Sequence, residues 1–327
     1  MTGKSRDKPL CHKACAAYRL SVRPAPWRTV PLSRIKSAIG MPLRTTMVLF
    51  AASGADLQSC HIHTISVWHP MSSPLQSESI RAQVAELRER GFVVARGLVG
   101  EEQCAALRQI AERQLREAAE PIEFEADLRY PGAPESKHAP GGHTVRRLLD
   151  AYSRDPAFAE RAIAPEIGAW MRAYFGEEPV LSRAHHNCMM TKHPAYGSLT
   201  GWHRDFRYWS FERPDMVSVW LALGPETNEN GALWLVPGSH TAEFGPEAFD
   251  DAKFFRSDLP ANKKMIDAAT CPSLQTGDVV FFHSNTLHSA GQNRSDQVKF
   301  SLVYTYHGAS NRPVPGTRSA SRPEVQF

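Results

Sequence analysis

The sequence has no long hydrophobic run. No apolar stretch in its 327 residues approaches the roughly 18 residues that a membrane-spanning helix needs, so we expect no such helix and no membrane partner. Cysteine is also scarce, because the six residues of this type are too scattered for a disulfide framework. This favours a reducing compartment, the cytoplasm. The hydrophobic content of 42% is typical of a soluble globular protein.

Acidic residues are almost absent from the first 70 positions, where ten Lys and Arg face only Asp7 and Asp56. The remainder carries 28 basic and 32 acidic residues, so the net charge of +4 is unevenly spread. A basic leader is typical of a transit peptide or a nucleic-acid-binding arm, but this one lacks amphipathic periodicity and zinc-finger spacing. We favour a third interpretation, in which residues 1–70 are a disordered or untranslated leader and residues 71–327, beginning at Met71, form one domain. We then expect no nucleic-acid partner.

The first half of the expected domain has helical periodicity. Apolar residues recur at helical spacing from Ser77, and Gly91 stands where a helix cap belongs. A strand is expected over 92–99, and a second helix begins at Glu101. Residues 146–176 again favour helix, interrupted by two prolines. This region therefore predicts a helical layer.

The second half changes to short segments rich in β-branched and aromatic residues, bounded by Gly, Pro, Asn and Asp. The segments are 217–224, 232–240, 277–283 and 299–307. Short strands at this density behind helices predict a mixed α+β fold that is mainly β. We expect a double-stranded β-helix, the cupin-like jelly roll, buttressed by the N-terminal helices.

The stretch GWHRDFRYWSF at 201–211 contains an H-x-D motif. In a β-strand, His203 and Asp205 would project from the same face. One imidazole and one carboxylate are two of the three ligands of the facial triad that holds Fe(II). The alternative is a buried His–Asp hydrogen bond without metal, since short motifs also arise by chance.

A third ligand has two candidates in FFHSNTLHSAGQNRS, which follows a later strand. They are His283 and His288. In a jelly roll, strands far apart in sequence meet inside one core. Either histidine could instead be hydrogen-bonded for structural reasons.

Three ordered motifs resemble the phytanoyl-CoA dioxygenase family of Fe(II)- and 2-oxoglutarate-dependent oxygenases. They are HRDFRYWSF at 203–211, VSVWLALGPETNENGALWLVPGSH at 217–240, and GDVVFFHSNTLHSAGQNRS at 277–295. The resemblance runs from about residue 78 to 310 and is strongest from 201 to 305. It implies a jelly roll that binds Fe(II), 2-oxoglutarate and dioxygen.

The resemblance also implies roles for individual residues. His203, Asp205 and His288 fall on the family's iron ligands, and Trp220 falls on a position that lines the cosubstrate pocket. It leaves structural roles to the remaining histidines of these motifs, with His283 supporting a strand end and His240 shaping a turn.

Two positions depart from the family. Eleven residues beyond the second iron histidine, an arginine usually binds the distal carboxylate of 2-oxoglutarate, and this chain has Lys299. A lysine keeps the charge but loses the planar fork. We expect a hydroxyl to supply the second contact, with these candidates: Tyr304, Ser289 and Ser301. Arg294 is a weaker substitute, and Lys299 could instead be a strand-edge lysine that faces water. Ala290 replaces a serine common in the family.

The chemistry that the resemblance implies is hydroxylation of a small molecule, with 2-oxoglutarate converted to succinate and CO₂. An acid at Asp205 favours hydroxylation over halogenation. Strand alternation would place Arg207 on the side of His203 and Asp205, where we expect it to meet an anionic substrate group. The alternative is an arginine paired with a carboxylate at the barrel rim.

Two other classes remain open. One is a catalytically silent jelly-roll binding protein, suggested by Lys299 and Ala290. The other is a cupin-type metalloenzyme that does not use 2-oxoglutarate. The loops at 120–145 and 241–270 carry no motif that names a substrate, and nothing in the sequence determines the oligomeric state.

Overall fold

The structure is a computed structural model that describes residues 74–128 and 130–327. The expectations for residues 1–70 therefore lie outside the described residues. Within the described ranges, no helix is both long and apolar enough to cross a membrane.

The helices lie mainly in the first half, as predicted. They are α1 (Pro74–Arg90), α2 (Glu101–Arg116), α3 (Ala151–Arg154), α4 (Pro156–Ala162), α5 (Pro165–Phe175) and α6 (Pro260–Ile266). The first ends at Arg90 and is followed by Gly91, whose φ of +84° suits a residue without a Cβ. Proline occupies the first turn of α4, α5 and α6, where no backbone donor is needed.

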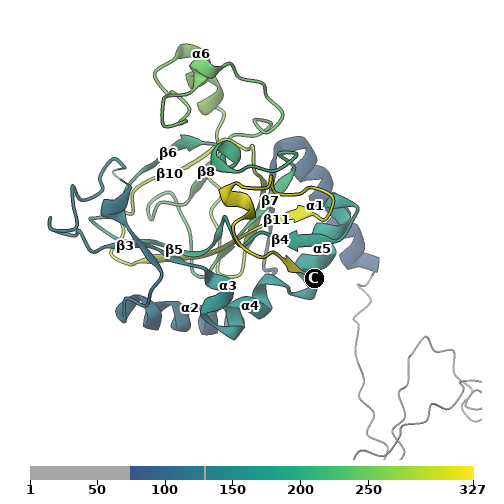
Figure 1. The fold of residues 1–327 in the computed structure, drawn as a ribbon, viewed down its shortest axis with the longest axis horizontal. Coiled ribbons are helices and arrows are strands. Elements are labelled where there is room, and N and C mark those ends of the chain that lie inside the picture. The colour runs from purple at the N-terminus through teal and green to yellow at the C-terminus, as the bar shows by residue number, and fades with distance from the viewer. Residues whose placement is uncertain (1–73, 129) are drawn as a thin grey trace, which may run out of the picture. The chain divides into compact units, whose positions relative to one another are not determined.

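The strands form two antiparallel sheets. They are β1 (Phe92–Ala95), β2 (Ile122–Phe124), β3 (Val145–Leu149), β4 (Pro179–Leu181), β5 (Asn187–Lys192), β6 (Thr200–His203), β7 (Met216–Ala222), β8 (Leu233–Leu235), β9 (Val279–His283), β10 (His288–Ala290), β11 (Lys299–Gly308) and β12 (Val325–Gln326). The main sheet has the order β1-β9-β7-β11-β5-β3-β2, with β4 paired to β11 and β12 paired to β4, and the small sheet has the order β6-β10-β8. The predicted jelly-roll architecture is confirmed (Figure 1).

Three local predictions were wrong in detail. The strand expected over 92–99 ends at Ala95. The start of the expected helical stretch 146–176 belongs to β3, because its residues pair with β5. The strand expected through the H-x-D motif ends at His203, and the short 3₁₀ helix η3 (Asp205–Tyr208) follows it. The two candidate ligands therefore lie on a strand end and a turn.

The two faces of the main sheet bury different clusters. One face packs against α1, α2, α4 and α5 (Figure 1), where Trp170 of α5 stacks on Phe281 of β9 at 3.9 Å between ring centroids. The other faces the interior of the jelly roll and includes Trp220, Val280 and Val303. Side chains alternate between the two faces along β11, so this strand contributes to both clusters. The interior of the jelly roll adjoins the candidate site.

Candidate metal centre

His203, Asp205 and His288 converge at the small sheet. The antiparallel pairing of β6 with β10 sets His203 directly opposite His288. Their Nε2 atoms lie 3.7 and 3.5 Å, respectively, from Oδ1 of Asp205. One ligand atom from each residue lies within 4.8 Å of the other two, and all three residues are buried. The structure thus brings together the three residues that the sequence singled out.

The two histidines present lone pairs to one another and to the carboxylate. The Nδ1 of His203 donates to the carbonyl of Gly201 at 2.8 Å, and the Nδ1 of His288 donates to that of Thr286 at 2.9 Å. A carbonyl only accepts, so Nδ1 carries the proton and Nε2 is free to bind a metal. Burial, with a smaller effect of His288, lowers the pKa of His203 well below its usual value. His203 is therefore neutral, as a ligand must be.

Asp205 is held so that one oxygen faces the imidazoles. Its Oδ2 accepts a bond from Ser218 at 3.4 Å, and Ser218 in turn lies 3.2 Å from the hydroxyl of Thr305. Its Oδ1 remains directed at the histidines. Two neutral nitrogens and one carboxylate oxygen are the donor set of the Fe(II) facial triad, which keeps other coordination positions open. The residues present fit that metal.

The other two histidines of the motifs lie elsewhere. His283 accepts a bond from the backbone amide of Asn285 at 3.0 Å. His240 bonds the carbonyl of Arg88 at 3.1 Å, at the end of α1. These contacts agree with the structural roles expected for both.

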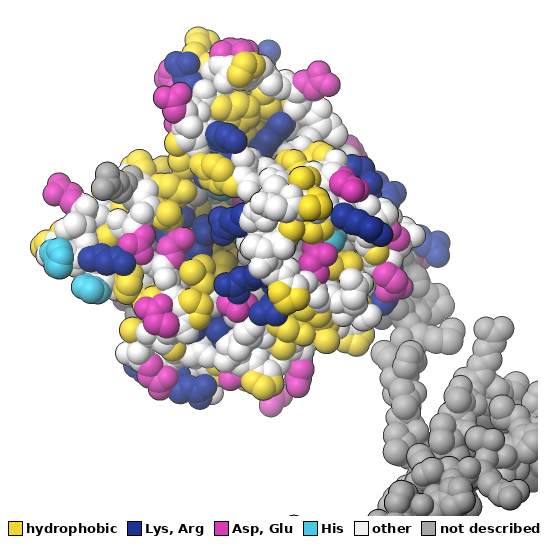
Figure 2. Space-filling model, in the orientation of Figure 1, with side chains coloured by type: hydrophobic (Ala, Val, Ile, Leu, Met, Phe, Trp, Pro, Cys, Tyr) yellow, Lys and Arg dark blue, Asp and Glu magenta, His cyan; other side chains and the backbone are white. Residues whose placement is uncertain are grey.

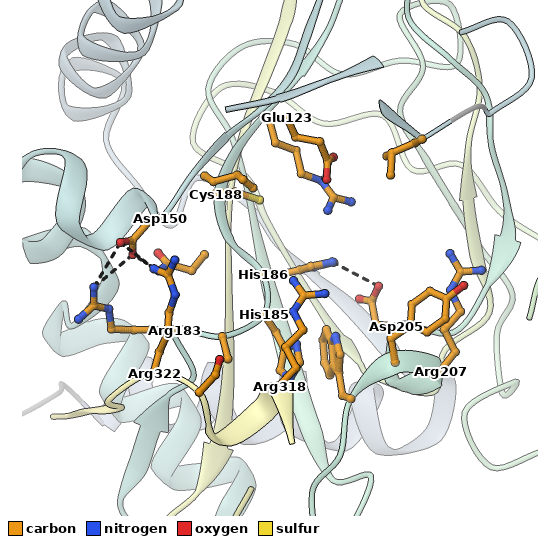
Figure 3. A pocket seen from close by; sticks show the side chains of 18 of the residues that line it. Glu123, Asp150, Arg183, His185, His186, Cys188, Asp205, Arg207, Arg318 and Arg322 are labelled. Atoms are coloured by element: carbon orange, nitrogen blue, oxygen red, sulfur yellow. Dashed lines mark hydrogen bonds and ion pairs between the residues drawn. The ribbon is translucent and has the colours of Figure 1, made fainter. Parts of the chain in front are cut away.

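A cavity of about 480 Å³ opens beside His203 and Asp205 (Figure 3). It is rich in guanidinium groups, and Lys and Arg side chains surround a hollow on this face in Figure 2. Its arginines are Arg147, Arg183, Arg207, Arg318 and Arg322. Four of them come from segments that the motifs did not cover, so sequence reasoning found only Arg207.

The cavity arginines differ in how their charges are balanced. Arg183 and Arg322 pair with Asp150 at 3.3 and 2.8 Å. Arg207 and Arg318 have no ion pair with any carboxylate of the described chain. Together these contacts leave positive charge facing the space next to the metal ligands.

Arg207 is nevertheless held in place. Its guanidinium lies 4.1 Å from the ring centre of Phe254 and donates to the carbonyl of Lys253 at 3.3 Å. Both partners belong to the segment 241–270, which covers the small sheet. The charge of Arg207 is therefore held in place but not neutralised. In the alternative, an arginine paired with a carboxylate at the barrel rim, it would be neutralised.

His186 was missed by the sequence reasoning. It lines the cavity, and its Nε2 lies 3.5 Å from Oδ1 of Asp205 (Figure 3). Burial lowers the pKa of His186 to about 4, against the opposing charge of Asp205. It precedes β5 and has no motif spacing to the triad, so only the fold reveals it.

Lys299 does not face water. Its Nζ donates to Oε2 of Glu226 at 2.8 Å and to Ser301 at 3.3 Å. Glu226 also accepts bonds from Ser301 at 2.6 Å and from the indole of Trp220 at 3.0 Å. The pair is buried, with side-chain exposures of 5% for Lys299 and 0% for Glu226. Glu226 was not among the sequence candidates.

The remaining cosubstrate candidates do not face the triad. Tyr304 lies on the helix-facing side of β11, where its hydroxyl donates to the carbonyl of Phe158 at 2.8 Å. Ser289 alternates with His288 along β10 and projects from the opposite face. Arg294 lies in a loop, and its guanidinium donates to the carbonyl of Asn228 at 3.5 Å. We do not propose these three as cosubstrate contacts.

Comparisons with known proteins identify similar chains. The family described as Phytanoyl-CoA dioxygenase (PhyH) matches residues 87–301. The peroxisomal phytanoyl-CoA dioxygenase of Homo sapiens is 26% identical, over 70% of this chain and 73% of its own length. The ectoine dioxygenase of Stutzerimonas stutzeri (strain A1501) is 25% identical, over 73% of this chain and 80% of its own.

Solved structures share the fold. The epimerase SnoN of nogalamycin biosynthesis, described as alpha-ketoglutarate dependent, superposes with a TM-score of 0.60 at 23% identity, over 73% of this chain and 86% of its own. EctD from S. alaskensis, solved with 2-oxoglutarate and 5-hydroxyectoine, has a TM-score of 0.60 at 21% identity, over 74% and 81% of the two chains.

Proposed function

The chain belongs to the phytanoyl-CoA dioxygenase family, and on that premise we propose that it hydroxylates a small anionic molecule. It is an Fe(II)- and 2-oxoglutarate-dependent dioxygenase. The reaction proposed consumes 2-oxoglutarate and dioxygen and releases succinate and CO₂. The observation that carries the proposal is the convergence of His203, Asp205 and His288 beside an arginine-lined cavity.

In this proposal His203, Asp205 and His288 hold the iron. When bound, Fe(II) with its cosubstrates supplies the oxidising power to break a C–H bond. The chain contributes neutral imidazoles fixed by backbone carbonyls, and a carboxylate fixed by Ser218. It also excludes water, since the ligands are 8%, 5% and 4% exposed in that order.

The cavity lining supports an anionic substrate class. Arg207 and Arg318 present charges without carboxylate partners in the described chain, so a carboxylate or phosphate of the substrate would gain charge-assisted hydrogen bonds. Trp209 and Tyr208 line the same space and offer apolar surface. The volume of about 480 Å³ suits a small metabolite.

Product analysis tests the reaction type. The purified enzyme is incubated with Fe(II), 2-oxoglutarate and dioxygen, and carboxylate- or phosphate-bearing compounds are compared with neutral analogues. We expect anionic compounds to stimulate succinate formation and to yield a product with one added oxygen atom. An isomerised product, or one oxidised without added oxygen, would contradict hydroxylation while leaving the enzyme class intact.

The role of Arg207 is tested by substitution. Arg207→Gln is expected to raise the KM for the anionic substrate about tenfold or more, because a charge-assisted bond is lost. Arg256→Gln is the matched control, since Arg256 pairs with Asp258 at 2.8 Å and does not line the cavity. An unchanged KM in Arg207→Gln rules out the substrate contact.

A further inference from the structure

The surroundings of Lys299 already contain a carboxylate. An ammonium (Lys299), a hydroxyl (Ser301) and an indole N–H (Trp220) converge on Glu226. These are the donors that would bind the distal carboxylate of an incoming 2-oxoglutarate. The backbone of Glu226 is fixed as well, by two hydrogen bonds with Leu274, each of 2.9 Å. The chain thus fills this anion site with its own side chain.

A second carboxylate at this position would be disfavoured. Glu226 is fully buried, and two carboxylates in a buried site repel strongly. Displacing Glu226 would instead leave a buried carboxylate without its cation, which is also unfavourable. In addition, none of Lys299, Glu226 and Trp220 lines the cavity that reaches the metal ligands. Another cation must therefore neutralise the distal carboxylate.

Arg147 offers such a cation within the cavity. It lies on β3, opposite Glu123 of β2, and its Nε is 3.4 Å from Oε1 of that residue. Within the described chain its terminal nitrogens make no hydrogen bond, so the planar fork is available for bidentate contact. Burial opposes its charge, but the carboxylates of Glu123 and Asp205 keep the pKa of Arg147 above its usual value. Asp205 thus exerts an electrostatic effect on it.

Arg147 is the best placed of the cavity arginines for this task. Arg183 and Arg322 are held by Asp150. Arg207 is held by the segment 241–270, on the substrate side. Arg318 is exposed and begins a short 3₁₀ helix near the C-terminus. Arg147 alone among them is set in the main sheet, which gives it the rigid support that a cosubstrate anchor requires.

We propose that Arg147 receives the distal carboxylate of 2-oxoglutarate and that Glu226 closes the Lys299 site to it. This inference rests on the proposed function, because it concerns the cosubstrate of the same metal centre. Cosubstrate binding in this chain then depends on a strand outside the motifs that carry the family resemblance.

Equilibrium binding of 2-oxoglutarate tests the proposal without turnover. The protein is loaded with Mn(II) under anaerobic conditions and titrated with 2-oxoglutarate in a calorimeter. Arg147→Gln is expected to weaken binding about tenfold or more, through loss of a bidentate ion pair. Arg147→Lys, which keeps the charge without the fork, should fall between Gln and wild type.

The Lys299 site is tested with the double variant Lys299→Met/Glu226→Gln, which removes both charges and leaves no unpaired ion. We expect its dissociation constant for 2-oxoglutarate to stay within about twofold of wild type. Weaker binding by the double variant, or unchanged binding by Arg147→Gln, overturns the proposal. Tighter binding by the double variant also overturns it, because the cosubstrate would then bind in the site that the pair occupies in wild type.

Metal binding separates this inference from the proposed function. Each variant is first titrated with Mn(II) alone, and all are expected to bind it as wild type does, since none carries a change in the triad. If wild type binds Mn(II) but no 2-oxoglutarate, the proposed function fails. If wild type binds both Mn(II) and 2-oxoglutarate but the variants do not show the expected affinities for 2-oxoglutarate, only the assignment of Arg147 as the cosubstrate anchor fails.

Discussion

At the scale of single residues, the site depends on which nitrogen of each histidine carries the proton and on which charged side chains already have a partner. Two backbone carbonyls fix the histidine tautomers, and Ser218 fixes the carboxylate. Lys299 is held differently, by an ion pair with Glu226 that neutralises its charge in the absence of a ligand. Residue type alone does not show which partner a lysine has, because Lys299 could pair with the carboxylate of a ligand or with one of the chain's own.

Removal of the triad carboxylate should abolish tight metal binding. Asp205→Ala deletes one of the three ligands, so we expect Mn(II) affinity to fall by about 100-fold or more. Binding is measured by calorimetry, with the fold checked by circular dichroism. The control is Asp215→Asn, since Asp215 is 49% exposed and lies 3.9 Å from His283 rather than at the triad. Equal affinities of Asp205→Ala and wild type would show that the metal does not bind here.

The buried pair of Lys299 and Glu226 should respond asymmetrically to substitution. Glu226→Gln leaves an ammonium buried without its counter-charge, and we expect the free energy of unfolding to fall by about 3 to 5 kcal/mol. The double variant Lys299→Met/Glu226→Gln should lose clearly less. Guanidinium denaturation measures both values. Equal losses would indicate that the ammonium finds water or another partner.

At the scale of elements, β11 connects the protein's stability to its chemistry. Its outward residues Tyr304 and Tyr306 donate hydrogen bonds to carbonyls of α4 at 2.8 and 2.7 Å. Its inward residues Lys299 and Thr305 contact Glu226 and the Ser218 network. Period-two alternation places these two sets on opposite faces of one strand.

The turn before β9 depends on a glycine. Gly277 has φ +87°, and a Cβ there would lie 2.0 Å from the carbonyl oxygen of Val99. We expect Gly277→Ala to lower the free energy of unfolding by more than about 2 kcal/mol, because strain and a backbone clash add. Gly97→Ala is the matched control, since Gly97 has φ +55° with no atom within 4 Å of its Cβ position. It should cost only about 1 kcal/mol.

At the scale of the whole molecule, buried histidines make the fold sensitive to acid. Burial and neighbouring cations lower the pKa of His185 to about 3, and that of His283 to about 3. In the unfolded chain each would titrate near its usual value of about 6.5. Below that pH the unfolded state binds more protons than the folded one, so stability falls as the pH falls.

We therefore expect the metal-free protein to be less stable at pH 5.5 than at pH 7.5. Each such histidine contributes up to about 1.4 kcal/mol per pH unit between 6.5 and 3. Guanidinium denaturation at the two pH values measures the difference. His283→Asn should reduce it, since one titrating group is removed. A free energy of unfolding that does not change over this interval contradicts neutral burial of these imidazoles.

Sequence reasoning predicted the parts that depend on local pattern and motif order. Helical periodicity before Gly176 and short β-branched segments after it indicated helices against a jelly roll, and the motifs singled out His203, Asp205 and His288. The sequence did not predict the turn at Asp205. A strand and a 3₁₀ helix can both bring the aspartate of an H-x-D motif near its histidine.

By itself, then, the sequence determined the fold class and the donor set, because hydrophobic period and ligand chemistry are properties of short stretches. Only the tertiary structure decided what surrounds them. The pairing of Lys299 with Glu226 joins residues 73 positions apart, and Arg147 reaches the cavity only because β3 joins the main sheet. Electrostatic neutralisation acts through space, so the partner of a buried charge is known only once strand order and register are known.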